Sequence, residues 1–291
     1  MDRTKSLAVL MALAAGLCAC RREPVIVVGS KNFTEQVILG EIVAQHLEKR
    51  LAPLRIERKL NLGGTLLAHQ ALTAGGIDVY PEYSGTALMA VLDRPVERDR
   101  AKVNEIVYRA YRERWSLVWM RPLGFNNTFA MVVRPDTPPS IRSLTDAALA
   151  DRRWRLGIGY EFVDRPDGLK GLLETYPLKL DGAPKDMDLG LLYQALEQNQ
   201  VDLAAGSTTD GLIDARNFRV LADDRHYFPP YEAALVVRGA ALEAHPRLKA
   251  ALEELSGRFT DESMRKMNYA VDGKHERVEE VARKFLRESG L

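Results

Sequence analysis

The amino-acid sequence predicts an α/β protein built from two related lobes. A short pattern occurs twice. Residues 69–72 (HQAL) are followed after four residues by 77–79 (IDV), and residues 193–196 (YQAL) are followed after four residues by 201–203 (VDL). Every matched position is displaced by 124 residues, as from 69 to 193 and from 78 to 202. A constant displacement over so long a separation favours an internal duplication over a chance match, and the length of 291 residues fits two domains.

Each copy of the pattern predicts a helix, a tight turn and a short buried strand. A strand candidate lies upstream of each copy, and each is followed by glycine. These candidates are residues 25–28 (VIVV) and 154–158 (WRLGI). After the first of these strands, apolar residues recur at helical spacing and predict a helix (Val37, Ile38, Ile42, Val43 and Leu47). Asn32 and Glu35 have the spacing of a capping box, so we expect this helix to begin there, with its first amides pointing toward the loop.

Two further strand candidates bracket the second copy, at residues 125–134 (FNNTFAMVVR) and 231–238 (YEAALVVR). Such a pair is what a hinge of two strands requires. We therefore predict that residues 24–126 together with 234–291 form lobe 1, and that residues 127–233 form lobe 2. The tail from residue 242 onward has apolar side chains at three- and four-residue spacing, so we expect it to be helical and to pack on lobe 1.

The N-terminal segment has the pattern of a bacterial lipoprotein signal peptide. Arg3 and Lys5 precede an apolar run of 11 residues at 7–17, which is too short for a bilayer that needs about 20 residues. The sequence Leu-Cys-Ala-Cys then resembles a lipobox, so we predict a signal peptide at residues 1–20 that ends at a lipidated Cys20. A plain cleaved signal peptide or a short anchor is the alternative. The prediction places the folded chain outside the cytoplasm, tethered by its lipid alone.

The composition and motifs argue against several classes of function. With 41 basic and 40 acidic residues, no overall field attracts the chain to nucleic acid. The five histidines are scattered without metal-ligand spacing, so we expect no metal and no cofactor. HExxH, Walker, GxGxxG and GxSxG motifs are missing from the sequence. Ser207 lies in a polar loop without an evident base, so we interpret the loop as a turn and expect no enzyme. A secreted enzyme on the same scaffold is kept as a remote alternative.

Several motifs together resemble one known family, the glycine betaine, choline and osmoprotectant substrate-binding proteins of ABC importers. The motifs follow the family's order and are residues 29–36 (GSKNFTEQ), 61–65 (NLGGT), 77–86 (IDVYPEYSGT), 126–128 (NNT), 209–211 (TDG) and 228–231 (FPPY). The resemblance implies a two-lobed type II periplasmic-binding-protein fold with a two-stranded hinge. It also implies a monomer that binds a small solute between the lobes, with an ABC permease and an ATPase subunit as partners.

The ligands of this family carry a quaternary ammonium group, which has no N–H to donate and is held instead by aromatic faces. The resemblance assigns two of these faces to Tyr83 and Tyr193. Two other positions depart from the family pattern. Phe129 stands where a tyrosine is common and keeps the ring without the hydroxyl, and Ser207 stands where another tyrosine is common and offers no ring.

For the anionic end of a zwitterionic ligand, the resemblance implies Gln36, Thr86 and Arg165, because a guanidinium can bind a carboxylate through two hydrogen bonds. Lys31 is expected to assist in the open form. Asn127, in the Asn-Asn-Thr motif, completes the predicted ligand-binding set.

The sequence thus predicts a solute-binding lipoprotein of an ABC importer that takes up glycine betaine, choline or carnitine. Loss of the ring at Ser207 leaves open a different solute, such as a betaine derivative of an aromatic amino acid or an amino-acid-like compound. A chemosensory binding protein, which would dock on a receptor instead of a permease, is also left open.

Overall fold

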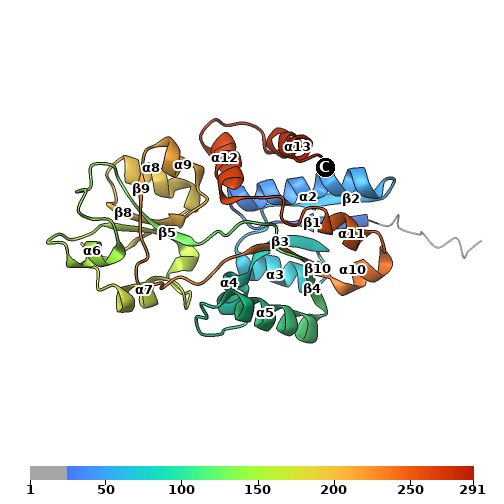
Figure 1. Cartoon of the computed structure of the whole chain (residues 1–291), viewed down its shortest axis with the longest axis horizontal. Helices are drawn as coiled ribbons and strands as arrows, with labels where there is room; N and C mark the ends of the chain where they lie inside the picture. The colour runs from blue at the N-terminus through green and yellow to red at the C-terminus, as the bar shows by residue number, and fades with distance from the viewer. Residues whose placement is uncertain (1–24) are drawn as a thin grey trace, which may run out of the picture.

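The computed structural model describes residues 25–291, which form two lobes that lie side by side along the long axis of the molecule (Figure 1). The predicted signal peptide and Cys20 lie outside the described residues. Each lobe contains one five-stranded sheet flanked by helices. Within residues 25–291, none of the helices has the length and apolar character needed to cross a bilayer.

The sheet of lobe 1 has the strand order β2, β1, β3, β10, β4. β1 is parallel to β2 and β3, whereas β10 is antiparallel to β3 and β4. The strands are β1 (Val25–Gly29), β2 (Arg55–Lys59), β3 (Val79–Tyr83), β4 (Leu117–Trp119) and β10 (Ala233–Arg238). The helical segments between them are α2 (Thr34–Leu51), α3 (Thr65–Thr73), α4 (Ser84–Thr86), η1 (Ala87–Val91) and α5 (Arg100–Trp115).

The sheet of lobe 2 has the strand order β7, β6, β8, β5, β9. β6 is parallel to β7 and β8, and β5 is antiparallel to β8 and β9. The strands are β5 (Phe129–Val133), β6 (Leu156–Gly159), β7 (Lys185–Met187), β8 (Leu203–Ser207) and β9 (Arg219–Leu221). The helical segments are α6 (Leu144–Leu149), η2 (Tyr160–Phe162), α7 (Leu169–Thr175), η3 (Leu189–Leu191), α8 (Leu192–Glu197) and α9 (Gly211–Ala215).

The two sheets share one topology, which confirms the predicted duplication. In each lobe three parallel strands are followed by one antiparallel strand that arrives from the other lobe and by a short edge strand. The turns inside the repeated pattern also match. Residues 76 and 77 both donate a backbone N–H to the carbonyl of Ala71, and residues 200 and 201 both donate to the carbonyl of Ala195. The sequence similarity therefore records an equivalent chain path.

The start of α2 differs from the prediction, and the predicted capping box is wrong. The N-cap residue is Phe33, which has an extended backbone and makes no side-chain cap hydrogen bond. Asn32 precedes the cap, and the Glu35 side chain turns inward, where Tyr83 and Asn127 donate to it. The carboxylate of Glu35 therefore accepts hydrogen bonds in the space between the lobes and does not cap the helix.

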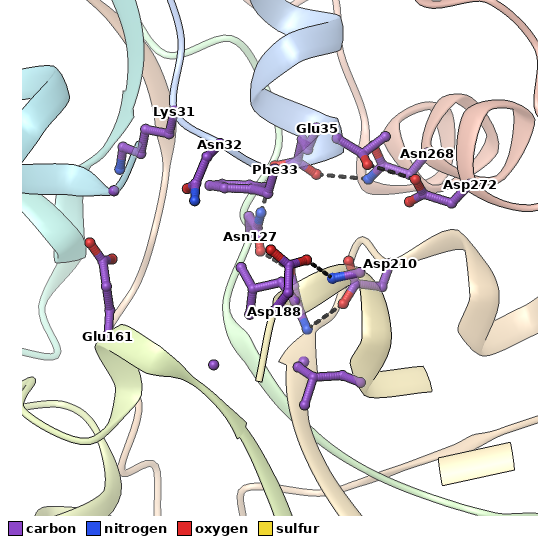
Figure 2. A pocket seen from close by; sticks show the side chains of 18 of the residues that line it. Lys31, Asn32, Phe33, Glu35, Asn127, Glu161, Asp188, Asp210, Asn268 and Asp272 are labelled. Atoms are coloured by element: carbon purple, nitrogen blue, oxygen red, sulfur yellow. Dashed lines mark hydrogen bonds between the residues drawn. The ribbon is translucent and has the colours of Figure 1, made fainter. Parts of the chain in front are cut away.

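Two chain segments connect the lobes, as the two-stranded hinge prediction requires. Asn126 and Glu232 form an isolated antiparallel bridge. Beside it, the backbone N–H of Asn127 donates to the carbonyl of Tyr231 at 3.0 Å. The first segment continues into β5 of lobe 2, and the second continues into β10 of lobe 1. Figure 2 shows Asn127 on the first segment, between residues of the two lobes.

The C-terminal tail forms α10 (Gly239–Ala244), α11 (Leu248–Glu253), α12 (Asp261–Asp272) and α13 (Val278–Glu288). As predicted, it packs on lobe 1, where α11, α12 and α13 contact α2. One contact was not predicted. α12 also packs against α9 of lobe 2, and Arg265 pairs with Asp214 there at 3.1 Å. Figure 1 shows α12 at the junction of the lobes.

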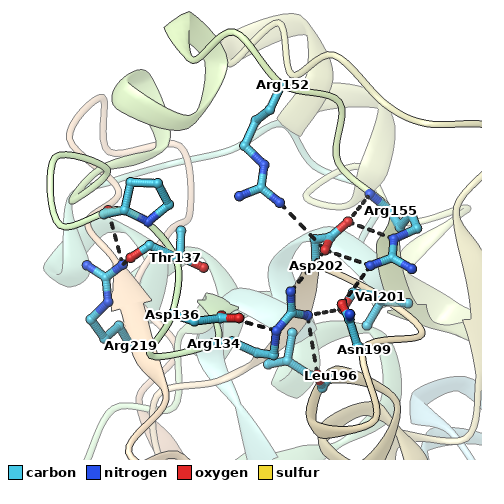
Figure 3. Close-up of polar contacts among 11 residues, drawn as sticks. Arg134, Asp136, Thr137, Arg152, Arg155, Leu196, Asn199, Val201, Asp202 and Arg219 are labelled. Atoms are coloured by element: carbon cyan, nitrogen blue, oxygen red, sulfur yellow. Dashed lines mark hydrogen bonds and ion pairs between the residues drawn. The ribbon is translucent and has the colours of Figure 1, made fainter.

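The aspartate of each repeat ties three parts of its lobe together. Asp78 accepts the backbone N–H of Val27 at 2.9 Å and pairs with Arg238 at 2.9 Å. Its counterpart, Asp202, accepts from the backbone and side chain of Arg155 and pairs with Arg134 at 3.1 Å (Figure 3). Asp78 therefore links β1 to the arginine at the end of β10, and Asp202 links the residue before β6 to the arginine that follows β5.

Asp202→Asn should test how much this arrangement stabilises the fold. We expect the free energy of unfolding to fall by about 2 kcal/mol at pH 7, because Arg155 and Arg134 lose their shared counterion. Hydrogen bonds from Arg155 hold the pKa of Asp202 far below its usual value. The stabilisation is therefore present above about pH 4 and is lost as the pH falls through the range in which Asp202 takes up a proton.

Urea unfolding, followed by the fluorescence of Trp154 in the core of lobe 2, measures this effect. The control is Asp186→Asn, which changes an exposed aspartate on β7 and should stay within about 0.5 kcal/mol of the parent protein. Equal stabilities of the Asp202→Asn and Asp186→Asn variants would contradict the assigned role.

Candidate functional site

A cavity of about 740 Å³ lies between the two lobes, and residues of both lobes and of α12 line it. Its size is in the range of small-molecule sites in proteins. The structure brings eight of the nine predicted ligand-binding residues to this cavity, and they are Lys31, Tyr83, Thr86, Asn127, Phe129, Arg165, Tyr193 and Ser207.

Gln36 is the exception, because it does not reach the cavity wall. Its side chain is fully buried in lobe 1, and its Oε1 accepts the backbone N–H of Lys31 at 3.3 Å. Gln36 is not among the residues that line the cavity, and a direct ligand contact there stays a prediction. Gln36 instead supports the loop that carries Lys31.

Tyr83 and Tyr193 enter the cavity from opposite lobes. Tyr83 ends β3, its ring stacks with Phe33 at 6.2 Å between centroids, and the Lys31 ammonium lies 5.2 Å from its centroid. Tyr193 lies on α8, its ring stacks with Phe218 at 6.0 Å, and its hydroxyl donates to Asp210. Both rings are thus fixed by their neighbours before any solute arrives.

The two departures from the family pattern are direct neighbours. Phe129 on β5 is paired with Ser207 on β8, so both side chains lie on the same face of the lobe 2 sheet. The Phe129 ring packs against Phe162 and Tyr231. Ser207 donates its hydroxyl to Asn127, which lies on the first connecting segment. One patch of the wall therefore carries a single ring where the pattern has two phenols.

The two cationic side chains of the cavity already have buried partners. Lys31 pairs with Glu82 at 2.5 Å, and Glu82 is fully buried. Arg165 pairs with Asp167 at 2.5 Å, and its Nη2 also lies 3.5 Å from the hydroxyl of Thr86. Burial lowers the pKa of Lys31, and Glu82 opposes that shift. Both cations are therefore paired within the protein, and a contact of Arg165 with the anionic end of a solute stays a prediction.

Glu35 is the point where four segments meet. Its carboxylate accepts from the Tyr83 hydroxyl at 2.6 Å, from Asn127 Nδ2 at 2.5 Å and from Asn268 Nδ2 at 3.0 Å. Asn268 also donates to the carbonyl of Thr209 in lobe 2 at 2.8 Å. These contacts join α2, β3, the first connecting segment and α12. Figure 2 shows Glu35 with Asn127 and Asn268. Burial raises the pKa of Glu35, while its hydrogen-bond donors act against the rise.

Asp210 is a second carboxylate at the seam between the lobes. It accepts the backbone N–H of Ser207 at 2.8 Å and the Tyr193 hydroxyl. Burial raises the pKa of Asp210 to about 7, and the nearby carboxylates of Glu35 and Asp272 add to the rise. Asp272 lies on α12, where its Oδ1 accepts from the hydroxyl of Thr34 at 2.6 Å.

Acidic side chains outnumber basic ones around the cavity, and sequence reasoning did not assign them to the site. The cationic residues are two (Lys31 and Arg165), and the acidic residues are five (Glu35, Glu161, Asp188, Asp210 and Asp272). Glu35 and Asp210 lie inside the motifs that carried the resemblance, so that signal was available. The role of Asp272 depends on where α12 docks, which no local pattern in the sequence specifies.

Comparison with known proteins gives the same assignment as the fold. Residues 24–288 match the family model of the substrate binding domain of ABC-type glycine betaine transport system. The glycine-betaine-binding protein of Pseudomonas aeruginosa is 35% identical over 301 aligned positions, which cover 99% of this chain and 94% of that protein. A crystal structure of a glycine betaine/carnitine/choline ABC transporter superposes with a TM-score of 0.77 at 28% identity, covering 91% of this chain and 98% of that one.

A further relative is longer than this chain. The ergothioneine transport permease/ergothioneine binding protein EgtU of Helicobacter pylori (strain G27) is 34% identical over 273 residues, which cover 92% of this chain. This chain spans 48% of the length of that relative. The predicted fold class and the resemblance seen in the sequence are both confirmed. The chain belongs to the family of substrate-binding domains of ABC-type glycine betaine transport systems.

Proposed function

We propose that this protein captures a quaternary ammonium solute between its lobes and delivers it to the permease of an ABC importer. The observation that carries the proposal is the combination, in one cavity, of fixed tyrosine rings from both lobes with an excess of acidic side chains. A trimethylammonium group is attracted by both features and needs no hydrogen-bond acceptor.

The rings and the carboxylates act together on the cation. Each aromatic face contributes about 0.5–2 kcal/mol, more when water is excluded from it. The carboxylate of Asp210 lies behind Tyr193, and that of Glu35 lies behind Tyr83, since each accepts the hydroxyl of that ring. A negative charge at the hydroxyl end increases the electron density of the ring, and it also attracts the cation directly.

Closure of the lobes completes the cavity. Asn127 contacts Glu35 in lobe 1 and Ser207 in lobe 2, and Asn268 spans the same seam. A solute that touches both lobes stabilises the closed form by its higher affinity for that form. We propose that the permease recognises the closed form, and that Cys20 carries the lipid that holds the protein at the outer face of the cell membrane.

A larger or more polar solute is a second candidate, favoured by the altered wall at Phe129 and Ser207. Both residues line the cavity, and a serine side chain takes up less of that space than a tyrosine ring would. The relationship to an ergothioneine-binding protein is consistent with a betaine derivative of an aromatic amino acid.

A thermal-shift panel separates the two candidates. It compares choline, glycine betaine, carnitine, proline betaine and ergothioneine, each at the same concentration. A solute present at 100 times its Kd stabilises the folded protein by about 2.7 kcal/mol and should raise the melting temperature by several degrees. A shift with ergothioneine alone would favour the larger solute over the small solutes of the glycine betaine, choline and carnitine type.

Paired variants of Tyr83 test the aromatic contact. Tyr83→Leu should weaken choline binding about tenfold, because the ring face is lost. Tyr83→Phe keeps the face and removes only the hydroxyl that Glu35 accepts, so its affinity should stay within about threefold of the parent protein. Isothermal titration calorimetry measures both values, and circular dichroism confirms that both variants fold. If the Leu and Phe variants lost affinity equally, the hydroxyl and not the ring would hold the solute.

The pH dependence of choline binding tests the acidic contribution. Choline keeps its charge at every pH, so any change reports the protein. Asp210 loses its proton as the pH rises through about 7, and the ionised form attracts the cation. Affinity should therefore increase between about pH 6 and pH 8, by up to about tenfold if only ionised Asp210 binds.

Asp210→Asn should remove most of this pH dependence and hold the affinity near its low-pH value. Three other groups face the same seam and remain in this variant, namely Glu35 from α2, Asp272 from α12 and the Tyr193 hydroxyl from α8. A pH profile that kept its full slope in the variant would assign the titration to one of the other carboxylates.

A further inference from the structure

A carboxylate of lobe 2 crosses the cavity and binds the start of a lobe 1 helix. Glu161, in η2 directly after β6, accepts the backbone N–H of Thr65 at 3.0 Å. Thr65 is the first residue of α3, and both residues line the cavity. Figure 2 shows the Glu161 side chain rising from lobe 2 toward the segment of lobe 1 that carries Lys31.

Gly64 makes this approach possible. It is the N-cap residue of α3, and a Cβ atom built there would lie 1.9 Å from Oε1 of Glu161. The backbone of Gly64 has φ −73°, which any residue can adopt. The carboxylate therefore occupies the space that a side chain at position 64 would enter, and any residue larger than glycine would displace it.

The position that Glu161 occupies favours a negative charge for several reasons. The N-terminus of α3 presents free N–H groups and the positive end of the helix dipole. Lys31 and Arg165 also lie near enough for the Glu161 charge to raise the pKa of both. The carboxylate of a zwitterionic solute would seek the same position.

We propose that Glu161 is an internal carboxylate that fills the anion position of the cavity and so selects solutes by charge. A cation without a carboxylate, such as choline, meets an acidic cavity whose anion position is already occupied. A zwitterion such as glycine betaine must first displace Glu161 and then lie near its negative charge. Because Glu161 is exposed, its side chain can be displaced, and the selection is a matter of degree. The inference rests on the proposed function and specifies its solute class.

The same contact holds the lobes together in the absence of solute. Glu161 belongs to lobe 2 and Thr65 to lobe 1, so their hydrogen bond exists only while the lobes are closed. Removing it should shift the solute-free protein toward an open arrangement.

Calorimetric titration of the full chain with choline and with glycine betaine tests the selection. The parent protein should bind choline at least about tenfold more tightly than glycine betaine. Glu161→Gln should lower the Kd of glycine betaine divided by the Kd of choline about tenfold. The control is Glu174→Gln, which removes an exposed glutamate of α7 in the same lobe and should leave the ratio unchanged. A parent protein that prefers glycine betaine, or a ratio unchanged by Glu161→Gln, would overturn the proposed selection.

A solute-free measurement tests the contact between the lobes independently. Spin labels on Glu113→Cys of α5 and Lys170→Cys of α7, with Cys18 and Cys20 changed to serine, report the distance between lobes by pulsed electron resonance. Glu161→Ala removes the carboxylate, and Gly64→Ala keeps its charge but fills its place. Both changes should move the distance distribution toward longer values.

The outcomes separate the two hypotheses. If the parent protein binds no solute of the thermal-shift panel, the proposed function is wrong, and the selection that rests on it falls with it. If it binds only solutes other than choline and glycine betaine, the selection is refuted while the proposed function stands. The spin-label distances still test the proposed contact between Glu161 and α3. Longer distances in both alanine variants would confirm that contact, and unchanged distance distributions in both would refute it.

Discussion

The arrangement of the cavity depends on one buried carboxylate, Glu35, that accepts hydrogen bonds from several segments at once. Its donors come from β3, from the first connecting segment and from α12, and one of them, Asn268, also reaches lobe 2. A buried charge without partners would destabilise the fold by several kcal/mol, so these donors must remain in place while the carboxylate is ionised. The need to satisfy Glu35 thus fixes the orientation of Tyr83 and Asn127, both of which face the solute space. It also explains why α12, which is remote in sequence, belongs to the site.

The duplication explains why the two lobes can present matched surfaces to one solute. In both lobes a helix of the repeated pattern begins and a strand ends at the cavity, with Tyr83 at the end of β3 and Ser207 at the end of β8. The carboxyl ends of parallel strands are the usual place for ligands in α/β sheets. The aspartates at the other end of these strands, Asp78 and Asp202, anchor the crossing strands instead. Stability and solute contact are thus placed at opposite ends of the same elements.

Much of the fold was predictable because it is encoded locally or repeated. The constant displacement between the two copies predicted two equivalent lobes, and the apolar segments before Arg134 and Arg238 predicted the crossing strands. The start of α2 was not predictable from local spacing. Glu35 accepts hydrogen bonds from residues that are distant in sequence, and the capping-box pattern considers only neighbours along the chain. The pairing of Lys31 with Glu82 was also missed, since Glu82 appears in the sequence only as part of a strand. Which charges are neutralised inside a cavity depends on tertiary distances, and these are not visible in a motif.

Phe129 and Ser207, which both differ from the family pattern, are paired in the register of β5 and β8 and therefore lie on one patch of the cavity wall. Asn127 bonds Ser207 on one side and Glu35 on the other. With serine at position 207, the amide of Asn127 links the acidic centre of lobe 1 directly to the wall of lobe 2. Compared with the family pattern, this wall lacks one aromatic face and has a hydrogen-bonded connection between the lobes in its place. On the proposed function, the carboxylates behind Tyr83 and Tyr193 would then supply a larger part of the attraction for a cation.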